Sequence, residues 1–324
     1  MRKALIVGIN NYPNSPLTGC ITDATKVGQL LESNGDGSPN FDINMQHDVK
    51  TKRELTQLIR ELFSGDSDIS LLYFSGHGTP DGGGCLVTPD ATGEGDMGVS
   101  LTEVLRLANK SKSKNKIIIL DCCFSGKLGE NGLTGTNESV ISPGVTIMTA
   151  STSEQVAMEG ALSSGGIFTN LFVEGLKGSA ADIGGNITPA SLYSFVDQSL
   201  GAWEQRPVFK TNITKFLPVR TVEPKVPLTT LRKLSQYFQN PSDEFGLDPS
   251  FEFTNDPLVE HKYEEPYASQ ENINKFKELQ SLESVGLIEP VGTEHMYFAA
   301  MESRSCKLTA LGLHYWRLAK DKRF

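Results

Sequence analysis

Short runs of apolar residues alternate along the first 210 positions with stretches in which apolar residues recur every three or four positions. Four runs are rich in branched aliphatic residues and bounded by turn residues, which predicts buried strands at residues 4–9, 69–74, 116–120 and 145–148. The helical period recurs at residues 23–32, 52–63, 101–107 and 168–176. Strands that alternate with such helices are typical of a mainly parallel sheet covered on both faces. With a further helix at 189–200 and a strand near 207–210, the pattern predicts one α/β domain over residues 1–218.

The pattern changes at residues 219–227, where prolines are frequent and no amphipathic period is visible, so we interpret this segment as a stiff linker. Beyond it, residues 228–324 predict a smaller α+β domain. Its expected elements are helices at 228–238 and 270–285, a hairpin of strands 287–291 and 296–301 around a Gly-Thr-Glu turn, and a closing helix at 308–318. Helices followed by a two-stranded wing and another helix resemble a winged-helix domain.

Composition restricts the classes of partner. The chain carries 39 Asp and Glu against 30 Lys and Arg, a net charge of −9, which disfavours nucleic acid and anionic membranes as partners. Five cysteines are an odd number in 324 residues and favour reduced thiols over a disulfide framework. The apolar run near the N-terminus is too short for a signal sequence or a membrane span. We therefore expect a cytoplasmic protein.

Two polar loops follow two of the predicted strands. One contains His77 between two glycines, and the other contains Cys122 and Cys123. Because ligands of open α/β sheets bind outside the carboxyl ends of the strands, a histidine and a cysteine from two such ends can share one site. A neighbouring imidazole raises the thiolate fraction of a cysteine, which is the minimal apparatus for acyl transfer. The backbone N–H of Gly78 and that of the nucleophilic cysteine would then form an oxyanion hole.

Six motifs carry a resemblance to a family. In chain order they are ALIVGINNYP (4–13), LTGCITDA (17–24), YFSGHG (73–78), DCCFSG (121–126), TASTSEQVAME (149–159) and GIFTNLFVEGLKG (166–178). Together they resemble the metacaspases and orthocaspases, cysteine peptidases of the caspase superfamily. The resemblance covers the first two-thirds of the chain and implies a caspase-like fold; no family signature reaches residues 221–324.

The resemblance implies a His–Cys dyad. His77 aligns with the general base, and Cys123 aligns with the nucleophile because it is the second residue after the Asp of its motif. The family more often has a small residue where Cys122 stands, so Cys122 remains the alternative nucleophile. In the competing interpretation both thiols are small buried residues and His77 is a core histidine.

The resemblance also implies the substrate class. An acidic residue of the GC-x-x-D motif and the Asp before the nucleophile line the first specificity pocket in this family, and these positions are Asp23 and Asp121 here. Two carboxylates favour a cation, so we expect cleavage after Arg or Lys. The alternatives are that Asp23 is a helix N-terminal acid and that Asp121 is a strand-end turn residue. True caspases hold an Asp with arginines, and Arg206 is the candidate for that specificity.

Many members of the resembled family require calcium. The paired acids of the family's calcium motif are absent here, although Asp81, Asp90, Glu94, Asp96 and Glu130 could offer oxygen ligands. No Cys or His spacing suits zinc. We therefore expect no required cofactor, with calcium activation as the alternative.

Control of the peptidase is expected through processing and through the C-terminal domain. Three basic residues match the expected specificity for autocleavage: Lys127, in a loop directly after the proposed nucleophile, and Arg220 and Lys225, in the linker. Residues 221–324 hold 12 Lys and Arg against 16 Asp and Glu, which disfavours DNA and favours a protein-binding or regulatory module.

The sequence thus predicts a cysteine endopeptidase that cleaves proteins after Arg or Lys and has a protein regulator at its C-terminal domain. The alternative is a catalytically weak caspase-fold adaptor that acts through protein–protein contacts. A different kind of hydrolase could also use a cysteine and a histidine, but no motif in the sequence indicates one. The resemblance suggests regulated cell death or antiviral defence as the process.

Overall fold

The computed structural model describes residues 1–80, 83–93, 96–122, 141–150, 166–200, 206–213, 215, 217–258 and 264–324. These residues form two compact units, Met1–Glu223 and Pro224–Phe324. The division falls within the segment 219–227. In the described part of the chain, no helix is both long and apolar enough to cross a membrane.

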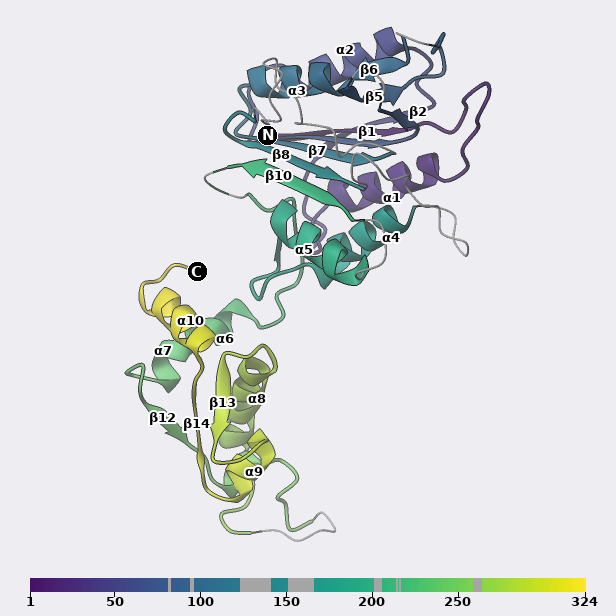
Figure 1. Cartoon of the computed structure of the whole chain (residues 1–324). Helices are drawn as coiled ribbons and strands as arrows, with labels where there is room; N and C mark the ends of the chain where they lie inside the picture. Colours follow the sequence, from purple (N-terminus) through teal and green to yellow (C-terminus); the bar gives the residue numbers. More distant parts are fainter. Residues whose placement is uncertain are drawn as a thin grey trace. The chain divides into compact units, whose positions relative to one another are not determined.

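The first unit is built on a six-stranded sheet with the strand order β10-β8-β7-β3-β1-β2 (Figure 1). Five of its strands are parallel, and β10 pairs with β8 in the antiparallel direction. The strands are β1 (Arg2–Gly8), β2 (Asp42–His47), β3 (Ile69–Ser75), β7 (Asn115–Asp121), β8 (Val145–Thr149) and β10 (Val208–Asn212). The predicted mainly parallel α/β sheet is confirmed.

Helices cover both faces of this sheet (Figure 1). One face carries α1 (Cys20–Glu32), α4 (Ile167–Glu174) and α5 (Pro189–Leu200), and the other carries α2 (Lys52–Phe63) and α3 (Leu101–Lys110). The hydroxyls of Thr51 and Ser100 accept N–H bonds at the starts of α2 and α3, which satisfies backbone donors that a helix leaves open. A short π-helical turn, Gly175–Ser179, follows α4 directly.

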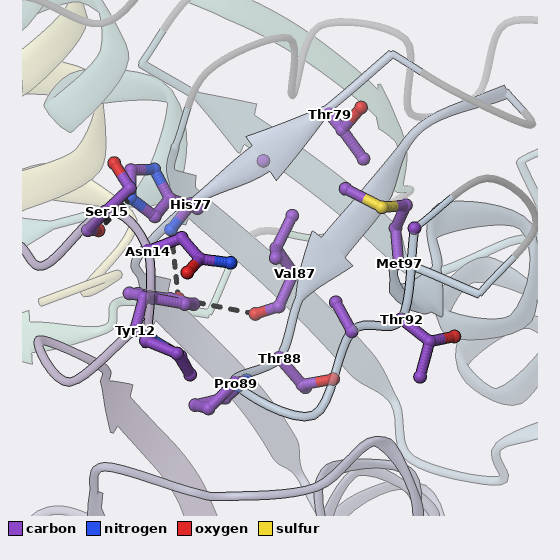
Figure 2. A pocket seen from close by; sticks show the side chains of 14 residues that line it. Tyr12, Asn14, Ser15, His77, Thr79, Val87, Thr88, Pro89, Thr92 and Met97 are labelled. Carbon is purple, nitrogen blue, oxygen red and sulfur yellow. Dashed lines mark hydrogen bonds between the residues drawn. The ribbon is translucent and has the colours of Figure 1, made fainter.

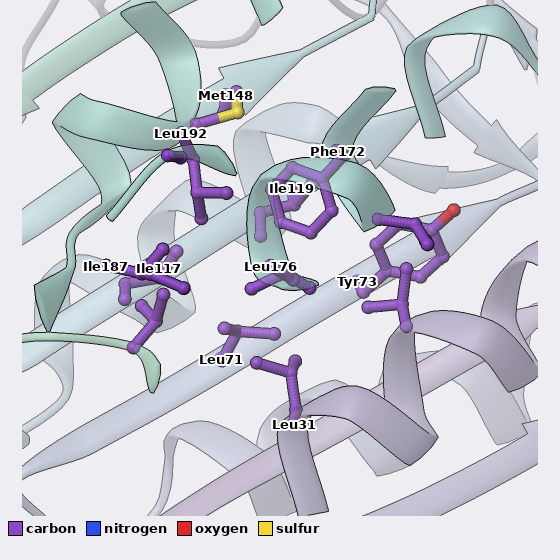
Figure 3. Close-up of a cluster of buried hydrophobic side chains, with 14 of the residues drawn as sticks. Leu31, Leu71, Tyr73, Ile117, Ile119, Met148, Phe172, Leu176, Ile187 and Leu192 are labelled. Carbon is purple, nitrogen blue, oxygen red and sulfur yellow. The ribbon is translucent and has the colours of Figure 1, made fainter. Parts of the chain in front are cut away.

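Two separate cores result from the alternation of side chains along the strands. Leu71 and Tyr73 of β3 face the α1, α4 and α5 side, where Figure 3 shows them beside Ile119 of β7. Leu72 and Phe74 of the same strand face the α2 and α3 side. Because successive side chains of a strand point to opposite faces, two chemically different sites can lie at the end of one sheet.

Two small sheets complete the first unit. Directly after β3, the strands β4 (Gly78–Thr79), β5 (Cys85–Val87) and β6 (Gly98–Ser100) form an antiparallel sheet. Gly98 has a φ of +143°, and a Cβ there would lie 2.1 Å from the carbonyl oxygen of Leu86, so this position requires glycine. The strands β9 (Asn186–Ile187) and β11 (Arg220–Thr221) form an antiparallel pair.

The second unit combines helices with a three-stranded antiparallel sheet of order β12-β14-β13. Its elements are α6 (Leu228–Arg232), α7 (Leu234–Tyr237), β12 (Glu244–Gly246), the 3-10 turn η4 (Pro249–Phe251), α8 (Gln270–Ser284), β13 (Ile288–Val291), α9 (Met296–Met301), β14 (Ser305–Leu308) and α10 (Ala310–Lys320).

The predicted hairpin in this unit is wrong in its second strand. Residues 296–301 form the helix α9, and the strand that pairs with β13 is β14. Met296, Ala299 and Ala300 are the buried residues of α9, a spacing of three and four positions that places them on one helical face. The connection between the paired strands therefore contains a helix instead of a tight turn. The winged-helix resemblance stays a prediction.

Candidate active site

His77 lies two residues after β3, with its ring and its backbone both engaged. Its ring Nε2 is 2.7 Å from the carbonyl oxygen of Ser15, and its backbone N–H donates to the Tyr12 hydroxyl over 3.0 Å (Figure 2). The rings of Tyr12 and His77 pack edge to face at 4.6 Å. A carbonyl oxygen can only accept a hydrogen bond, so the proton of this bond is on Nε2.

The loop that supplies Tyr12 and Ser15 is fixed by Asp48. This residue follows β2 and has a φ of +52°. Its carboxylate accepts the backbone N–H groups of Asn10 and Asn11 at 2.8 and 3.0 Å. Charge-assisted bonds of this kind hold the loop beside the histidine.

The two predicted pocket acids lie close together near the N-terminus of α4. Asp23, on α1, is 2% exposed, and Asp121, the last residue of β7, is 8% exposed. The N–H of Gly166 donates to Asp23 Oδ2 over 2.9 Å, and a Cβ at Gly166 would lie 3.0 Å from Asp121 Oδ2. The structure therefore brings Asp23 and Asp121 to one place although 98 positions separate them in the chain.

A chain of hydroxyl groups orients Asp121. The Tyr73 hydroxyl lies 2.7 Å from Thr169 Oγ1, which donates to Asp121 Oδ2 over 2.6 Å. Burial raises the pKa of Asp121 to about 6; the negative charge of Asp23 acts in the same direction, and the Thr169 bond opposes both. Such a carboxyl is poised to gain from a bound cation.

Asp23 also lies in the first turn of α1, as the alternative interpretation of a helix N-terminal acid requires. The ammonium of Lys26, one turn later, is 4.0 Å from Asp23 Oδ1 and 3.4 Å from the side-chain oxygen of Asn170. Asp23 therefore has a cation at its side, and both roles are compatible with its position.

Cys122 follows β7 and is 2% exposed. It belongs to the core on the α2 and α3 side, together with Ile118 and Leu120, as alternation along the strand requires. Cys123 and Lys127 lie outside the described residues, as do Asp81, Glu94 and Glu130.

A pocket of about 500 Å³ opens beside His77 and Gly78 (Figure 2). Gly78 begins β4, whose partner strand β5 is tied to the histidine because Val87 N–H donates to the His77 carbonyl over 3.0 Å. The Tyr12 hydroxyl in turn donates to the Val87 carbonyl over 3.3 Å. The rest of the pocket wall comes from residues 13–15 after β1, from Thr79 of β4 and from the loop between β5 and β6.

The other predicted residues have separate surroundings. Arg206 forms an ion pair with Asp197 of α5 at 2.7 Å. Asp90 accepts the backbone N–H of Lys52 at 3.0 Å, and Asp96 pairs with the Lys52 ammonium at 2.7 Å. Within the described ranges, no three His, Cys, Asp or Glu side chains gather as a metal site would require.

The two basic residues near the linker differ in accessibility. Arg220 is 9% exposed, and its guanidinium donates to the carbonyls of Ser33 and Leu176 at 3.0 and 2.6 Å. Burial lowers the pKa of Arg220. Lys225 is exposed.

Sequence reasoning missed the residues that position the site. The Tyr12 hydroxyl accepts the His77 N–H, and Asp48 accepts an N–H of the loop that carries Tyr12. Thr169 donates to Asp121. Tyr12 and Thr169 stand inside motifs that mark the resemblance, but nothing in a linear pattern shows which groups they contact. Asp48 stands in no motif.

Comparison with known proteins shows the family of the chain. The family described as the caspase domain, peptidase family C14, matches residues 1–218, so the chain belongs to the caspase-domain family, whose members are cysteine peptidases. Among solved structures, the chain is similar to caspase-1 from Spodoptera frugiperda, with 15% identity, a TM-score of 0.49, and coverage of 68% of this chain and 90% of that chain. No curated protein matches the sequence.

Proposed function

We propose that the protein is a cysteine endopeptidase of the metacaspase type that cleaves proteins after Arg or Lys. The observation that carries this proposal is the meeting of two buried carboxylates, Asp23 and Asp121, at the end of the sheet from which His77 also emerges. A buried pair of like charges is costly, and the half-exposed Lys26 ammonium, 4.0 Å from Asp23 Oδ1, offsets part of that cost. A substrate guanidinium or ammonium would neutralise the pair.

The acid pair accounts for discrimination as well as affinity. An Arg side chain offers a planar fork of N–H donors to carboxylate oxygens, whereas a neutral side chain would bring no opposite charge to the two carboxylates. An acidic side chain would add a third negative charge. Cleavage after Arg or Lys is therefore the specificity that this arrangement favours.

In the proposed reaction Nδ1 of His77 accepts the proton of the Cys123 thiol, and the resulting thiolate attacks the peptide carbonyl carbon, forming a C–S bond as the C=O bond opens to an oxyanion. The oxyanion accepts hydrogen bonds from the N–H groups of Gly78 and Cys123. His77 donates a proton from Nδ1 to the leaving amine as the C–N bond breaks, while its Nε2–H remains bonded to Ser15. Water then hydrolyses the thioester, with His77 accepting the proton.

The burial of Cys122 supports Cys123 as the nucleophile. A thiol that is 2% exposed within the core on the α2 and α3 side offers little surface to a substrate carbonyl. The residue before it, Asp121, belongs to the opposite face of the strand.

The test is hydrolysis of fluorogenic peptides that end in Arg, Lys or Asp, with and without calcium, by four forms of the protein. Wild type is expected to cleave after Arg and Lys. Cys123→Ala and His77→Ala should lose activity by several orders of magnitude, whereas Cys122→Ala, the matched control, should keep it. The calcium lanes test activation by that ion.

Three outcomes would contradict the proposal. Cleavage after Asp would exclude the acid pair as the specificity determinant and favour Arg206 as the residue that binds the substrate side chain. Loss of activity in Cys122→Ala but not in Cys123→Ala would move the nucleophile by one residue. Silence in every lane, together with no labelling by an active-site thiol probe, would favour the adaptor.

A further inference from the structure

The pocket beside His77 and the acid pair lie on opposite faces of the sheet. Tyr73, whose hydroxyl contacts the Thr169–Asp121 chain, belongs to the core on the α1, α4 and α5 side. Tyr12 and Val87, which line the pocket, belong to the core on the α2 and α3 side. His77 stands in the wall of the pocket and follows β3, the strand whose alternating residues supply both cores.

This arrangement gives a bound peptide a direction. If the cationic side chain before the scissile bond lies at the acid pair, the bond itself lies at Gly78 and His77. His77 must reach the leaving nitrogen to protonate it, so the chain that carries this nitrogen continues on the His77 side. The pocket of about 500 Å³ begins there.

We propose that this pocket binds the substrate residues that follow the scissile bond and selects uncharged, mainly apolar side chains at the first of them. The inference rests on the proposed function, because it takes its direction from the roles of His77 and the acid pair. It adds a second determinant of specificity on the leaving-group side.

The lining explains the selection. Val87, Ala91 and Met97 supply apolar surface, and threonine hydroxyls and the Asn14 amide supply neutral polar groups. Of the described residues that line the pocket, His77 and Tyr12 are the titratable ones. A charged substrate side chain would lose its hydration there without gaining a partner of opposite charge.

The pocket wall that carries Ala91 and Met97 is held in place by hydrogen bonds and an ion pair of Asp90 and Asp96. Asp90 accepts the Thr88 hydroxyl at 2.7 Å and the backbone N–H of Lys52 at 3.0 Å. Asp96 binds the ammonium of Lys52 at 2.7 Å. The Lys52 ammonium, from α2, is thus held by Asp96, and these bonds position the described residues of the wall before substrate arrives.

The pocket is large enough for more than a single side chain and falls within the usual size of small-molecule sites. Its volume therefore favours large apolar residues over glycine or alanine at the first position. We expect Leu and Phe to be preferred there.

The experiment uses the full-length protein and peptides that share one sequence ending in Arg before the bond and carry Leu, Asp or Lys after it. Wild type should cleave the Leu peptide with a kcat/KM at least about tenfold above the Asp and Lys peptides. Met97→Lys should raise the Asp-to-Leu ratio by about tenfold. Thr92→Lys, at an exposed position of the same wall, should shift the ratio in the same direction.

Gln57→Lys is the control, because it makes the same change of charge at an exposed position of α2 that does not line the pocket. It should leave the Asp-to-Leu ratio as in wild type. Equal cleavage of the three peptides by wild type, or an equal shift in Met97→Lys and Gln57→Lys, would overturn the proposal.

A peptide aldehyde ending in Arg separates this inference from the proposed function. Such an aldehyde adds the thiol across its C=O bond and has no residue beyond Arg, so wild type and Met97→Lys should be inhibited equally. Cleavage and inhibition without a preference after the bond would overturn the pocket alone. If the protein is neither active on the peptides nor inhibited by the aldehyde, the proposed function is overturned, and this inference with it.

Discussion

Asp121 is the residue whose chemistry depends most on its surroundings. A carboxyl group in water has a pKa near 4, but burial beside a second carboxylate raises the pKa of Asp121 to about 6. The sequence predicts an acid after the strand, and the family resemblance implies that Asp23 shares its pocket. Neither shows that Asp121 is buried or that Thr169 bonds to it. Those properties follow from contacts between β7, α1 and α4.

Asp121→Asn is expected to change how stability depends on pH. An acid whose pKa is higher in the folded protein binds more protons folded than unfolded between the two values, so wild type loses stability as the pH rises from about 4 to about 6. The variant lacks this loss, which amounts to roughly 2 to 3 kcal/mol.

Thermal unfolding of both proteins between pH 4 and pH 7.5 measures this difference. The melting temperature of the variant should rise relative to that of wild type as the pH rises. The variant should also lose affinity for a peptide aldehyde ending in Arg. A constant difference in melting temperature across the range would mean that Asp121 does not titrate abnormally.

At the scale of elements, the site depends on three segments that meet at His77. The loop after β1 provides Tyr12 and Ser15, the turn after β3 provides His77, and β5 provides Val87. The Tyr12 hydroxyl links all three because it accepts from His77 and donates to Val87. Burial raises the pKa of this hydroxyl, which keeps it protonated and able to donate.

Tyr12→Phe removes the hydroxyl that connects these three segments but keeps the aromatic ring, so we expect weaker positioning of His77 without a cavity. The His77 N–H would lose its partner, at a cost of about 1–3 kcal/mol in the free energy of unfolding. We expect kcat to fall several-fold while KM changes little, because the acid pair on the other face is untouched. Steady-state kinetics measure this split, with Tyr193→Phe as the control on α5; equal effects of the two variants would contradict the role given to Tyr12.

Elements with a strong pattern were predictable and those with a weak one were not. The buried strands β1, β3, β7 and β8 have continuous apolar runs, since both faces of the sheet are covered. The edge strand β2, with the sequence DINMQH, is polar and half exposed, so the pattern gave no strand there. Residues 296–301 have an apolar run that suits a strand, but packing of Met296, Ala299 and Ala300 selects a helix.

At the scale of the whole molecule, the chain joins a caspase-domain unit to a second unit of helices and antiparallel strands. The junction carries both a buried and an exposed basic residue. Arg220 is held by two backbone carbonyls within β11, whereas Lys225 is exposed. If the peptidase processes itself near this junction, accessibility should decide where.

Incubation of the active protein is therefore expected to yield a cut after Lys225 or after Lys127, and none after Arg220. Intact-mass measurement over time distinguishes the three sites. Lys225→Gln should abolish the product cut at the junction, and Cys123→Ala should abolish all products. An unchanged mass in active wild type would remove autoprocessing, and a cut after Arg220 would show that β11 detaches.

The sequence by itself determined the alternation of strands and helices, the ordered motifs and therefore the caspase-like class, because hydrophobic period and turn chemistry are local properties. It also named His77, Asp23 and Asp121. Tertiary structure alone decided that both acids are buried with Thr169 bonded to Asp121, that Ser15 and Tyr12 hold the histidine, and that a neutral pocket opens on the opposite face. These are consequences of strands adjacent in the sheet but distant in the chain, and no local pattern encodes such a distance.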